Sequence, residues 1–181
     1  MNIHDTRTYA AVIGLAVLGA VAVPAISTVS AGGAVHARAG VVNVAGDRIG
    51  FAKFTEDGTG GIHVNVKVSG LSPGLHGIHI HGVGSCVTGA SPAFTSAGSH
   101  HNPEGVLHGA HAGDLPNLVV DAEGRGTLNA HLAQFTLSAG PTTLLDNNGS
   151  AVVVHAAQDD YVTDPTGNSG GRIACGVITS G

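Results

Sequence analysis

Residues 98–114 hold the densest group of side chains in this sequence that could do chemistry. These 17 residues contain no lysine or arginine, and they hold four histidines and an aspartate that could bind metals: His100, His101, His108, His111 and Asp114. Just upstream, His79 and His81 are separated by a single residue. Residues two apart in a strand point to the same face, so these two imidazoles can aim at one point.

The residue types and the short intervals between them are typical of metal ligands. His108, His111 and Asp114 follow one another at intervals of three residues. Three imidazoles and one carboxylate suit a closed tetrahedral zinc site, and a further set of imidazoles alone suits copper. The alternative is a histidine-rich loop that binds metals loosely, which the mixed spacing disfavours.

The elements that must position these ligands are predicted to be strands. Valine and threonine recur between glycine-rich turns, glycine accounts for 29 of the 181 residues, and aromatic residues for 3%. This composition favours an all-β fold with a core of small aliphatic side chains. The length fits one domain plus a leader. The formal net charge of −5 and the scattered cations argue against binding to nucleic acid.

Eight strands are expected, one of them around His79 and His81. The others are expected at residues 41–44, 49–54, 62–68, 118–121, 127–132, 151–154 and 172–178. Two long loops, 82–113 and 156–171, show no strand pattern, and loops of this length in a compact domain are usually functional. A crossover segment spans 133–149. The pattern predicts an eight-stranded Greek-key β-barrel or sandwich with two long functional loops.

The amino terminus reads as a secretory signal peptide. An uncharged apolar run, residues 10–23, follows Arg7 and precedes small residues, which predicts a leader over residues 1–31 with cleavage between 31 and 37. The run is shorter than the ~20 residues of a bilayer span, and an uncleaved anchor is the alternative. The expected domain is 38–181, exported to the periplasm or outside the cell.

Other histidines and the two cysteines have structural explanations. His63 and His131 are predicted to be solvated on the outer faces of strands, and His76 to close a barrel end by bonding to backbone carbonyls. In an exported protein, Cys86 and Cys175 favour one disulfide, with two unrelated buried thiols as the alternative.

Five segments together resemble the copper–zinc superoxide dismutases, the bacterial exported members in particular. They read GLHGIHIHG, AGSHHNP, HGAHAGDLP, VVVHAAQDD and GNSGGRIACGVI, and the resemblance spans residues 38–179. It implies one redox-cycling copper per subunit, held by His79, His81, His100 and His155. It also implies one structural zinc per subunit, held by His100, His108, His111 and Asp114. His100 would bridge the two metals.

The resemblance also implies roles for residues that hold no metal. Asp159 would orient imidazoles from both sites, Arg172 would be the cation beside copper, and Cys86 would pair with Cys175. His100 would leave copper on reduction and carry a proton to the product. The implied activity is dismutation of superoxide to oxygen and hydrogen peroxide, which would protect the cell envelope. A homodimer and a copper-delivery partner are further expectations.

Three features depart from the family pattern. His101 stands where phenylalanine is common, and we expect a bystander rather than a competing ligand. The loop between His108 and His111 is short. No lysine or arginine lies between Lys67 and Arg125, so superoxide must be attracted locally.

The alternative function is a non-catalytic exported copper- or zinc-binding protein.

Overall fold

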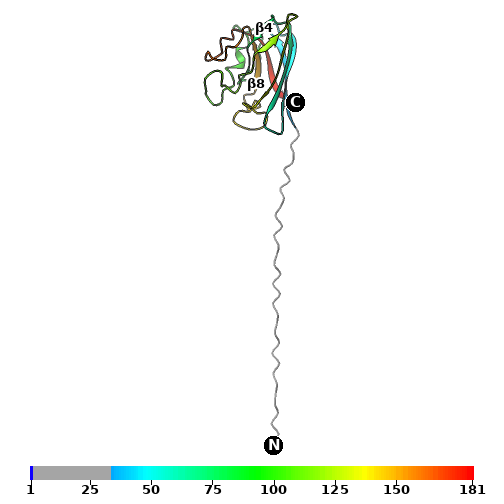
Figure 1. Cartoon of the computed structure of the whole chain (residues 1–181), viewed down its shortest axis with the longest axis vertical. Coiled ribbons are helices and arrows are strands. Elements are labelled where there is room, and N and C mark those ends of the chain that lie inside the picture. Colours follow the sequence, from blue (N-terminus) through cyan, green and yellow to red (C-terminus); the bar gives the residue numbers. More distant parts are fainter. Residues whose placement is uncertain (2–33) are drawn as a thin grey trace. The chain divides into compact units, whose positions relative to one another are not determined.

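The computed structural model describes residues 34–181 together with Met1, and this part of the chain is an all-β domain (Figure 1). The predicted signal peptide lies outside the described residues. Within the described part, no helix has both the length and the apolar character needed to cross a membrane. The strands are β1 (Val35–Asn43), β2 (Arg48–Glu56), β3 (Ile62–Ser69), β4 (Gly74–His76), β5 (Ile78–His81), β6 (Leu118–Val120), β7 (Arg125–Leu132), β8 (Ser150–His155) and β9 (Arg172–Ser180).

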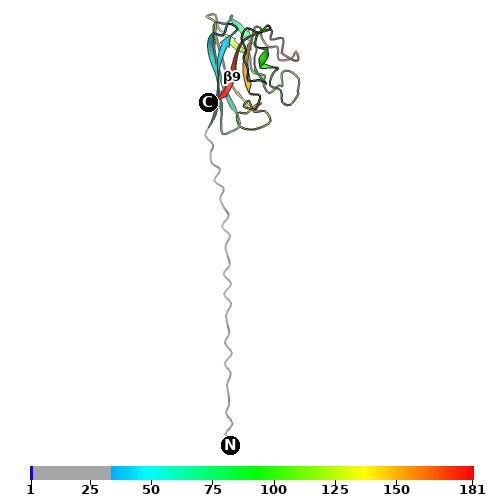
Figure 2. The same cartoon turned by 180° about the vertical axis from the view of Figure 1, so that it is seen from behind.

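The strands form one antiparallel sheet in the order β4-β6-β7-β3-β2-β1-β9-β8-β5. Its two end strands, β4 and β5, are consecutive in the chain, so the sheet curls into a nearly closed barrel. The loops that follow β5 and β8 lie on one side of this barrel, as Figures 1 and 2 show from opposite directions. The all-β barrel predicted from the sequence is therefore confirmed.

The strand count is nine in residues 34–181, where eight were predicted. The predicted strand around His79 and His81 is preceded by a separate short strand, β4, and Gly77 marks the change of partner. The Gly77 amide donates to the carbonyl of Ala157, and its carbonyl accepts from the His155 amide, both at 2.8 Å. A Cβ on Gly77 would lie 2.7 Å from the Ser169 Cβ, so only glycine fits this crossing.

Small aliphatic side chains from alternating positions fill the barrel. On β3, Val64, Val66 and Val68 are buried while His63 and Lys67 are exposed, as a period of two predicts. The hairpin that joins β6 to β7 also forms where it was expected. The barrel interior is thus apolar, and the chemistry lies outside it.

Strand β8 is buried along its whole length because side chains pack on both of its faces. Val152 and Val154 belong to the barrel core. Val153 faces the other way and packs with Phe94 and Ala97, which lie in or beside the short 3₁₀ helix Thr95–Ala97. The loop after β5 is therefore fixed to the barrel wall by its own small apolar cluster.

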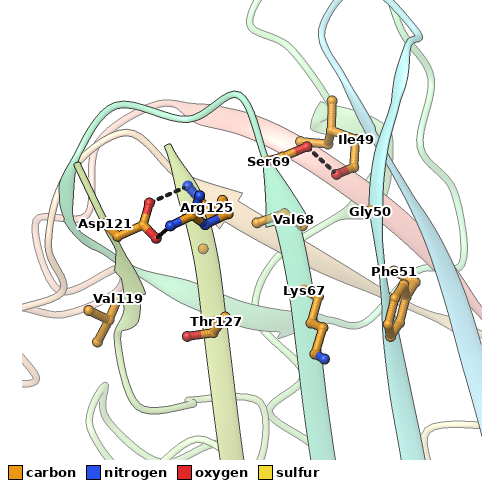
Figure 3. A pocket seen from close by; sticks show the side chains of 11 residues that line it. Ile49, Gly50, Phe51, Lys67, Val68, Ser69, Val119, Asp121, Arg125 and Thr127 are labelled. Carbon is orange, nitrogen blue, oxygen red and sulfur yellow. Dashed lines mark hydrogen bonds and ion pairs between the residues drawn. The ribbon is translucent and has the colours of Figure 1, made fainter. Parts of the chain in front are cut away.

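A shallow hollow of about 490 Å³ lies on the outside of the barrel, across β2, β3, β7 and β6 (Figure 3). Phe51, Lys67 and Thr127 are neighbours in register and line it, together with Val119. None of its lining residues belongs to the histidine-rich segments. The hollow and the candidate chemistry are therefore at different places on the molecule.

Candidate metal centre

The histidine-rich loop is held against β5 by backbone hydrogen bonds. The amide of Ile80 donates to the carbonyl of Gly113, and its carbonyl accepts from the amide of His101, both at 2.8 Å. Single bridges also pair His79 with Asp114 and His81 with His100. The loop thus runs beside β5 like an extra strand, and it brings ligands distant in sequence to the same face.

Two groups of potential ligands result, each with one ligand atom per residue and all ligand atoms within 4.8 Å of one another. The first group comprises His79, His81, His100 and His155. The second comprises His100, His108, His111 and Asp114. Every one of these residues is at most 9% exposed. The structure therefore brings together all seven residues singled out in the sequence, and His100 belongs to both groups.

Backbone carbonyls fix the orientation of two imidazoles in the first group. The Nδ1 of His81 donates to the carbonyl of Gly98 at 2.9 Å, and the Nδ1 of His155 donates to that of Gly170 at 3.1 Å. Their opposite nitrogens carry lone pairs that face the group. Five imidazole nitrogens are buried without a hydrogen-bond partner among the described residues: His79 Nδ1, His81 Nε2, His100 Nε2, His108 Nδ1 and His155 Nε2.

The ring of His100 lies between the two groups. Its Nδ1 is 3.0 Å from Asp114 Oδ1 and 3.3 Å from the Nδ1 of His111. Its Nε2 is one of the nitrogens without a partner, and the ring centroid is 3.9 Å from that of His79. One imidazole therefore offers one nitrogen to each group.

The carboxylate of Asp159 links the two groups by accepting a hydrogen bond from one imidazole of each. It is fully buried, and its two oxygens accept from the Nε2 of His79 at 2.7 Å and from the Nε2 of His108 at 2.9 Å. A Cβ on Gly167 would collide with this carboxylate and with the His108 ring, so glycine permits the close packing. One buried carboxylate thus sets which nitrogen of each imidazole stays free to bind a metal.

The residues that hold Asp159 in place could not be identified from the sequence. The side-chain oxygen of Asn117 accepts from the amide of Asp159, and its Nδ2 donates to the Asp159 carbonyl, both at 2.9 Å. The Tyr161 hydroxyl accepts a hydrogen bond from the backbone amide of Asn117 at 2.7 Å. An isolated asparagine and tyrosine in loops carry no ligand signal, and only the fold brings them together.

The crossover segment 133–149 also supports the centre. Gln134 donates to the carbonyl of Asp114 at 2.8 Å. The Nε2 of His101 donates to the carbonyl of Thr142 at 3.2 Å, and His101 belongs to neither ligand group. His101 thus joins the histidine loop to the crossover, in agreement with its prediction as a bystander.

Burial controls the protonation of the first group. Burial, with the nearby His100, lowers the pKa of His79 to about 3, and burial lowers the pKa of His81 to about 2 and of His155 to about 4. Burial tends to raise the pKa of Asp114, but the hydrogen bond from His100 and the nearby histidines lower it to about 2. At neutral pH the imidazoles of His79, His81 and His155 are therefore neutral and the carboxylate of Asp114 is ionised, as metal ligands must be.

Arg172 places a cation beside the first group. Its guanidinium donates to the carbonyl of Phe94 at 2.7 Å and to that of Gly98 at 2.6 Å. The same Gly98 carbonyl accepts from His81, and Arg172 is the register partner of His155. The half-buried guanidinium is therefore anchored by two carbonyls next to two of the candidate ligands.

Two further predictions concern residues that hold the loops. The disulfide between Cys86 and Cys175 is confirmed, and it ties the loop after β5 to strand β9. His76 lies at the barrel end as predicted, with its Nδ1 2.7 Å from the carbonyl oxygen of His155 and its Nε2 2.9 Å from that of Ser72. Both contacts brace the segment that leads to the ligands.

Comparison with known proteins gives consistent matches. A family model described as copper/zinc superoxide dismutase matches residues 48–178. The superoxide dismutase-like protein YojM of Bacillus subtilis (strain 168) is 40% identical over 146 residues, which cover 76% of this chain and 73% of that protein. The crystal structure of a SOD-like protein from Bacillus subtilis is 38% identical, with a TM-score of 0.72, and covers 77% of this chain and 96% of that chain. The crystal structure of the clock protein EA4 is also 38% identical, with a TM-score of 0.67 and coverage of 79% and 92%.

Proposed function

Since the chain belongs to the copper/zinc superoxide dismutase family, we propose that it catalyses the dismutation of superoxide. Two superoxide anions and two protons would give one molecule of oxygen and one of hydrogen peroxide. The proposal goes beyond family membership, because the matched relatives include proteins named superoxide dismutase-like and a clock protein. It therefore depends on the residues of this chain.

The observation that carries the proposal is the set of five buried imidazole nitrogens that have no hydrogen-bond partner in residues 34–181. A buried polar atom with no partner is costly unless something binds it. The four-imidazole group would hold copper, which favours nitrogen ligands. The group of three imidazoles and a carboxylate fits a closed zinc site. The residues present thus fit both metals of the family.

Copper, when bound, supplies the one-electron chemistry that neither the protein side chains nor zinc can provide. The chain supplies attraction, orientation and a proton. Arg172 would draw the anionic substrate to the copper group, and Asp159 would keep the imidazoles of His79 and His108 in position. The Nε2 of His100 is the atom on which a proton for the product would be held.

Attraction of superoxide would be local in this protein. The loop after β8 carries Asp159, Asp160 and Asp164 and no lysine or arginine. Asp160 is held within that loop by Thr163 and Asn168, and Asp164 accepts from the amide of His108 at 2.8 Å. These carboxylates serve the loop structure rather than the substrate. We therefore expect slower capture than in relatives with loop lysines, and a strong dependence on Arg172.

The site of action would be outside the cytoplasm. The disulfide between Cys86 and Cys175 supports this, because such bonds persist in oxidising compartments. An apolar run at residues 10–23 supports export as well. Amino-terminal sequencing of the protein from its native source tests this part: a start between residues 32 and 38 is expected, and an intact Met1 would contradict cleavage.

A second candidate function is metal binding without catalysis. The names of two relatives favour it, since they describe likeness to the enzyme rather than the enzyme itself. It differs from the first candidate in one respect only: the metal-loaded protein would not accelerate superoxide decay. One measurement therefore separates the two.

Superoxide decay is followed by pulse radiolysis with protein loaded with one copper and one zinc per chain. A chelator is added because free copper would also consume superoxide, and metal-free protein gives the background. Catalytic decay that disappears in His155→Ala and remains in His63→Ala supports the proposal. His63 is an exposed histidine on β3, outside both groups of the buried centre, so it is the matched control. Decay at the background rate in fully loaded protein would leave only the second candidate.

A further inference from the structure

A third group of potential ligands lies on the barrel exterior, separate from the buried centre. It comprises Asp57, in the turn after β2, His63 on β3 and His131 on β7. His63 and His131 are direct register partners on neighbouring antiparallel strands. Each of the three residues offers one atom, and these atoms lie within 4.8 Å of one another. The sequence alone predicts two independent solvated histidines, because it does not reveal the strand register that pairs them.

The three side chains converge on one oxygen. Asp57 Oδ2 is 2.9 Å from the Nε2 of His131 and 3.3 Å from the Nε2 of His63. The two imidazole rings lie 4.4 Å apart between centroids. In a tetrahedral site with metal–ligand bonds of ~2.0 Å, neighbouring ligand atoms are about 3.3 Å apart. The spacing of these atoms is thus already close to that of a metal site.

The carboxylate of Asp57 is held in this orientation by its own turn. Its Oδ1 accepts from the amide of Thr59 at 2.8 Å and from the Thr59 hydroxyl at 2.5 Å, which leaves Oδ2 directed at the histidines. The hydrogen bond from the Thr59 hydroxyl and that from His131 lower the pKa of Asp57. The oxygen ligand is therefore preset and ionised.

Space around the group suits a bound ion. A Cβ on Gly61 would collide with the imidazole of His131, so glycine at this position lets the ring reach Asp57. A hollow of about 280 Å³ lies beside the group, lined by both histidines and by the hydrogen-bonded pair Asn65 and Asn129. The group therefore faces solvent on one side, where water can complete the coordination.

We propose that Asp57, His63 and His131 form a third metal site that binds a divalent ion, Zn²⁺ or Cu²⁺. Two imidazoles and one carboxylate are ligands that both ions accept. Three protein ligands leave at least one position open, and the exposed location permits exchange with solution. The site is distinct from the buried centre, and it does not depend on the function proposed above.

The test uses the full chain with its buried groups first loaded with one copper and one zinc. Zn²⁺ is then titrated by equilibrium dialysis with elemental analysis, and Cu²⁺ in a parallel series. One additional ion per chain is expected. His63→Ala and His131→Ala should each weaken its binding by more than about tenfold, because a lost direct ligand costs at least as much as a lost outer partner. Gly61→Ala should also weaken it while keeping all three ligands.

Lys67→Ala is the matched control, since it removes an exposed side chain from the same face of β3 but no candidate ligand, and it should retain the third ion. Melting temperatures of the variants verify folding, and anomalous scattering at the zinc edge should place the ion between the three side chains. The proposal is overturned if no third ion binds, or if both histidine variants keep it with parental affinity.

Discussion

The buried centre and the exposed group of Asp57, His63 and His131 use the same residue types in opposite surroundings. In the buried centre, five imidazole nitrogens have no hydrogen-bond partner among residues 34–181. In the exposed group, the side chains of His63 and His131 are 62% and 51% exposed, and water can satisfy them. Burial thus decides whether a metal is the one partner available to an imidazole nitrogen or has to compete with water for that nitrogen. We expect tight, selective binding in the first case and weak, exchangeable binding in the second.

The two places also differ in how they are assembled. The exposed group needs a strand register and one short turn. The buried centre needs loops, a disulfide and a buried carboxylate to converge, with Gly77 and Gly167 permitting the close approach. The more elaborate assembly excludes water and fixes each imidazole before a metal arrives. Burial and fixation should therefore have measurable consequences for acid stability, metal affinity and activity.

The largest expected effect is the acid sensitivity of the metal-free protein. His79, His81 and His155 have folded pKa values of about 3, 2 and 4, against 6.5 in an ordinary environment. Below pH 6.5 these three histidines bind protons in the unfolded chain but stay neutral in the folded chain. The free energy of unfolding therefore falls as the pH falls towards 4. The slope approaches about 1.4 kcal/mol per pH unit for each imidazole.

Urea unfolding of metal-free protein between pH 7.5 and 4.5 measures this slope. The metal-loaded protein is the control, and it should keep its stability until acid releases the metals. Equal stability of the metal-free protein at pH 7 and pH 5 would contradict the inference that burial keeps these imidazoles neutral.

Removing one imidazole of the buried centre should come next in size. His155→Ala takes away a candidate copper ligand whose Nε2 has no other partner in the described part of the chain. Superoxide turnover should fall by more than about a hundredfold, since even outer partners of metal ligands contribute up to that much. Metal analysis should show copper lost and zinc retained. Full activity in a variant shown to lack His155 would mean that the four-imidazole group is not the copper site.

Asp159→Ala should have an intermediate effect on both metals. It removes the acceptor of two imidazole N–H groups, at 2.7 and 2.9 Å, while leaving every candidate ligand in place. Affinity for copper and for zinc should each fall by about 10–100-fold, measured by competition with a chelator. Asp160→Asn is the control, because Asp160 contacts its own loop and should leave both affinities unchanged. A loss confined to one metal would show that the carboxylate does not couple the two groups.

Much of the fold could be predicted because local patterns encode it, whereas the division of the ligands into two groups was implied by the family resemblance. The alternation along β3 and the paired histidines of β5 depend on a period of two, which any strand obeys. The division at Gly77 was missed, because the exchange of β6 for β8 as the partner strand leaves no local trace in the pattern.

What could not be predicted depends on contacts between segments far apart in the chain. Asn117 holds Asp159 across 42 residues of sequence, and Asn117 is itself bonded to Tyr161 across 44 residues. The exposed group needs the register that sets His63 opposite His131, 68 positions later. Neither partner carries a signal alone, so their roles appear only once the strands are paired.

The smallest expected effect comes from substituting Arg172, the cation beside the buried centre. Arg172 is bound to the carbonyls of Phe94 and Gly98, so its charge is fixed next to His81 and His155. Arg172→Ala should lower the second-order rate constant with superoxide roughly tenfold, because one fixed charge supplies most of the local attraction. The rate constant of Arg172→Lys should lie between those of the parent and of Arg172→Ala, since lysine keeps the charge but cannot donate to both carbonyls.

The salt dependence of the rate separates attraction from a structural effect of the substitution. The parental rate should fall as ionic strength rises, and the rate of Arg172→Ala should fall less steeply. Copper content must remain at one per chain in both proteins for the comparison to hold. A rate within about twofold of the parent in Arg172→Ala would show that the metal charge alone attracts superoxide. The anchored guanidinium would then serve to hold the Gly98 carbonyl in place for His81.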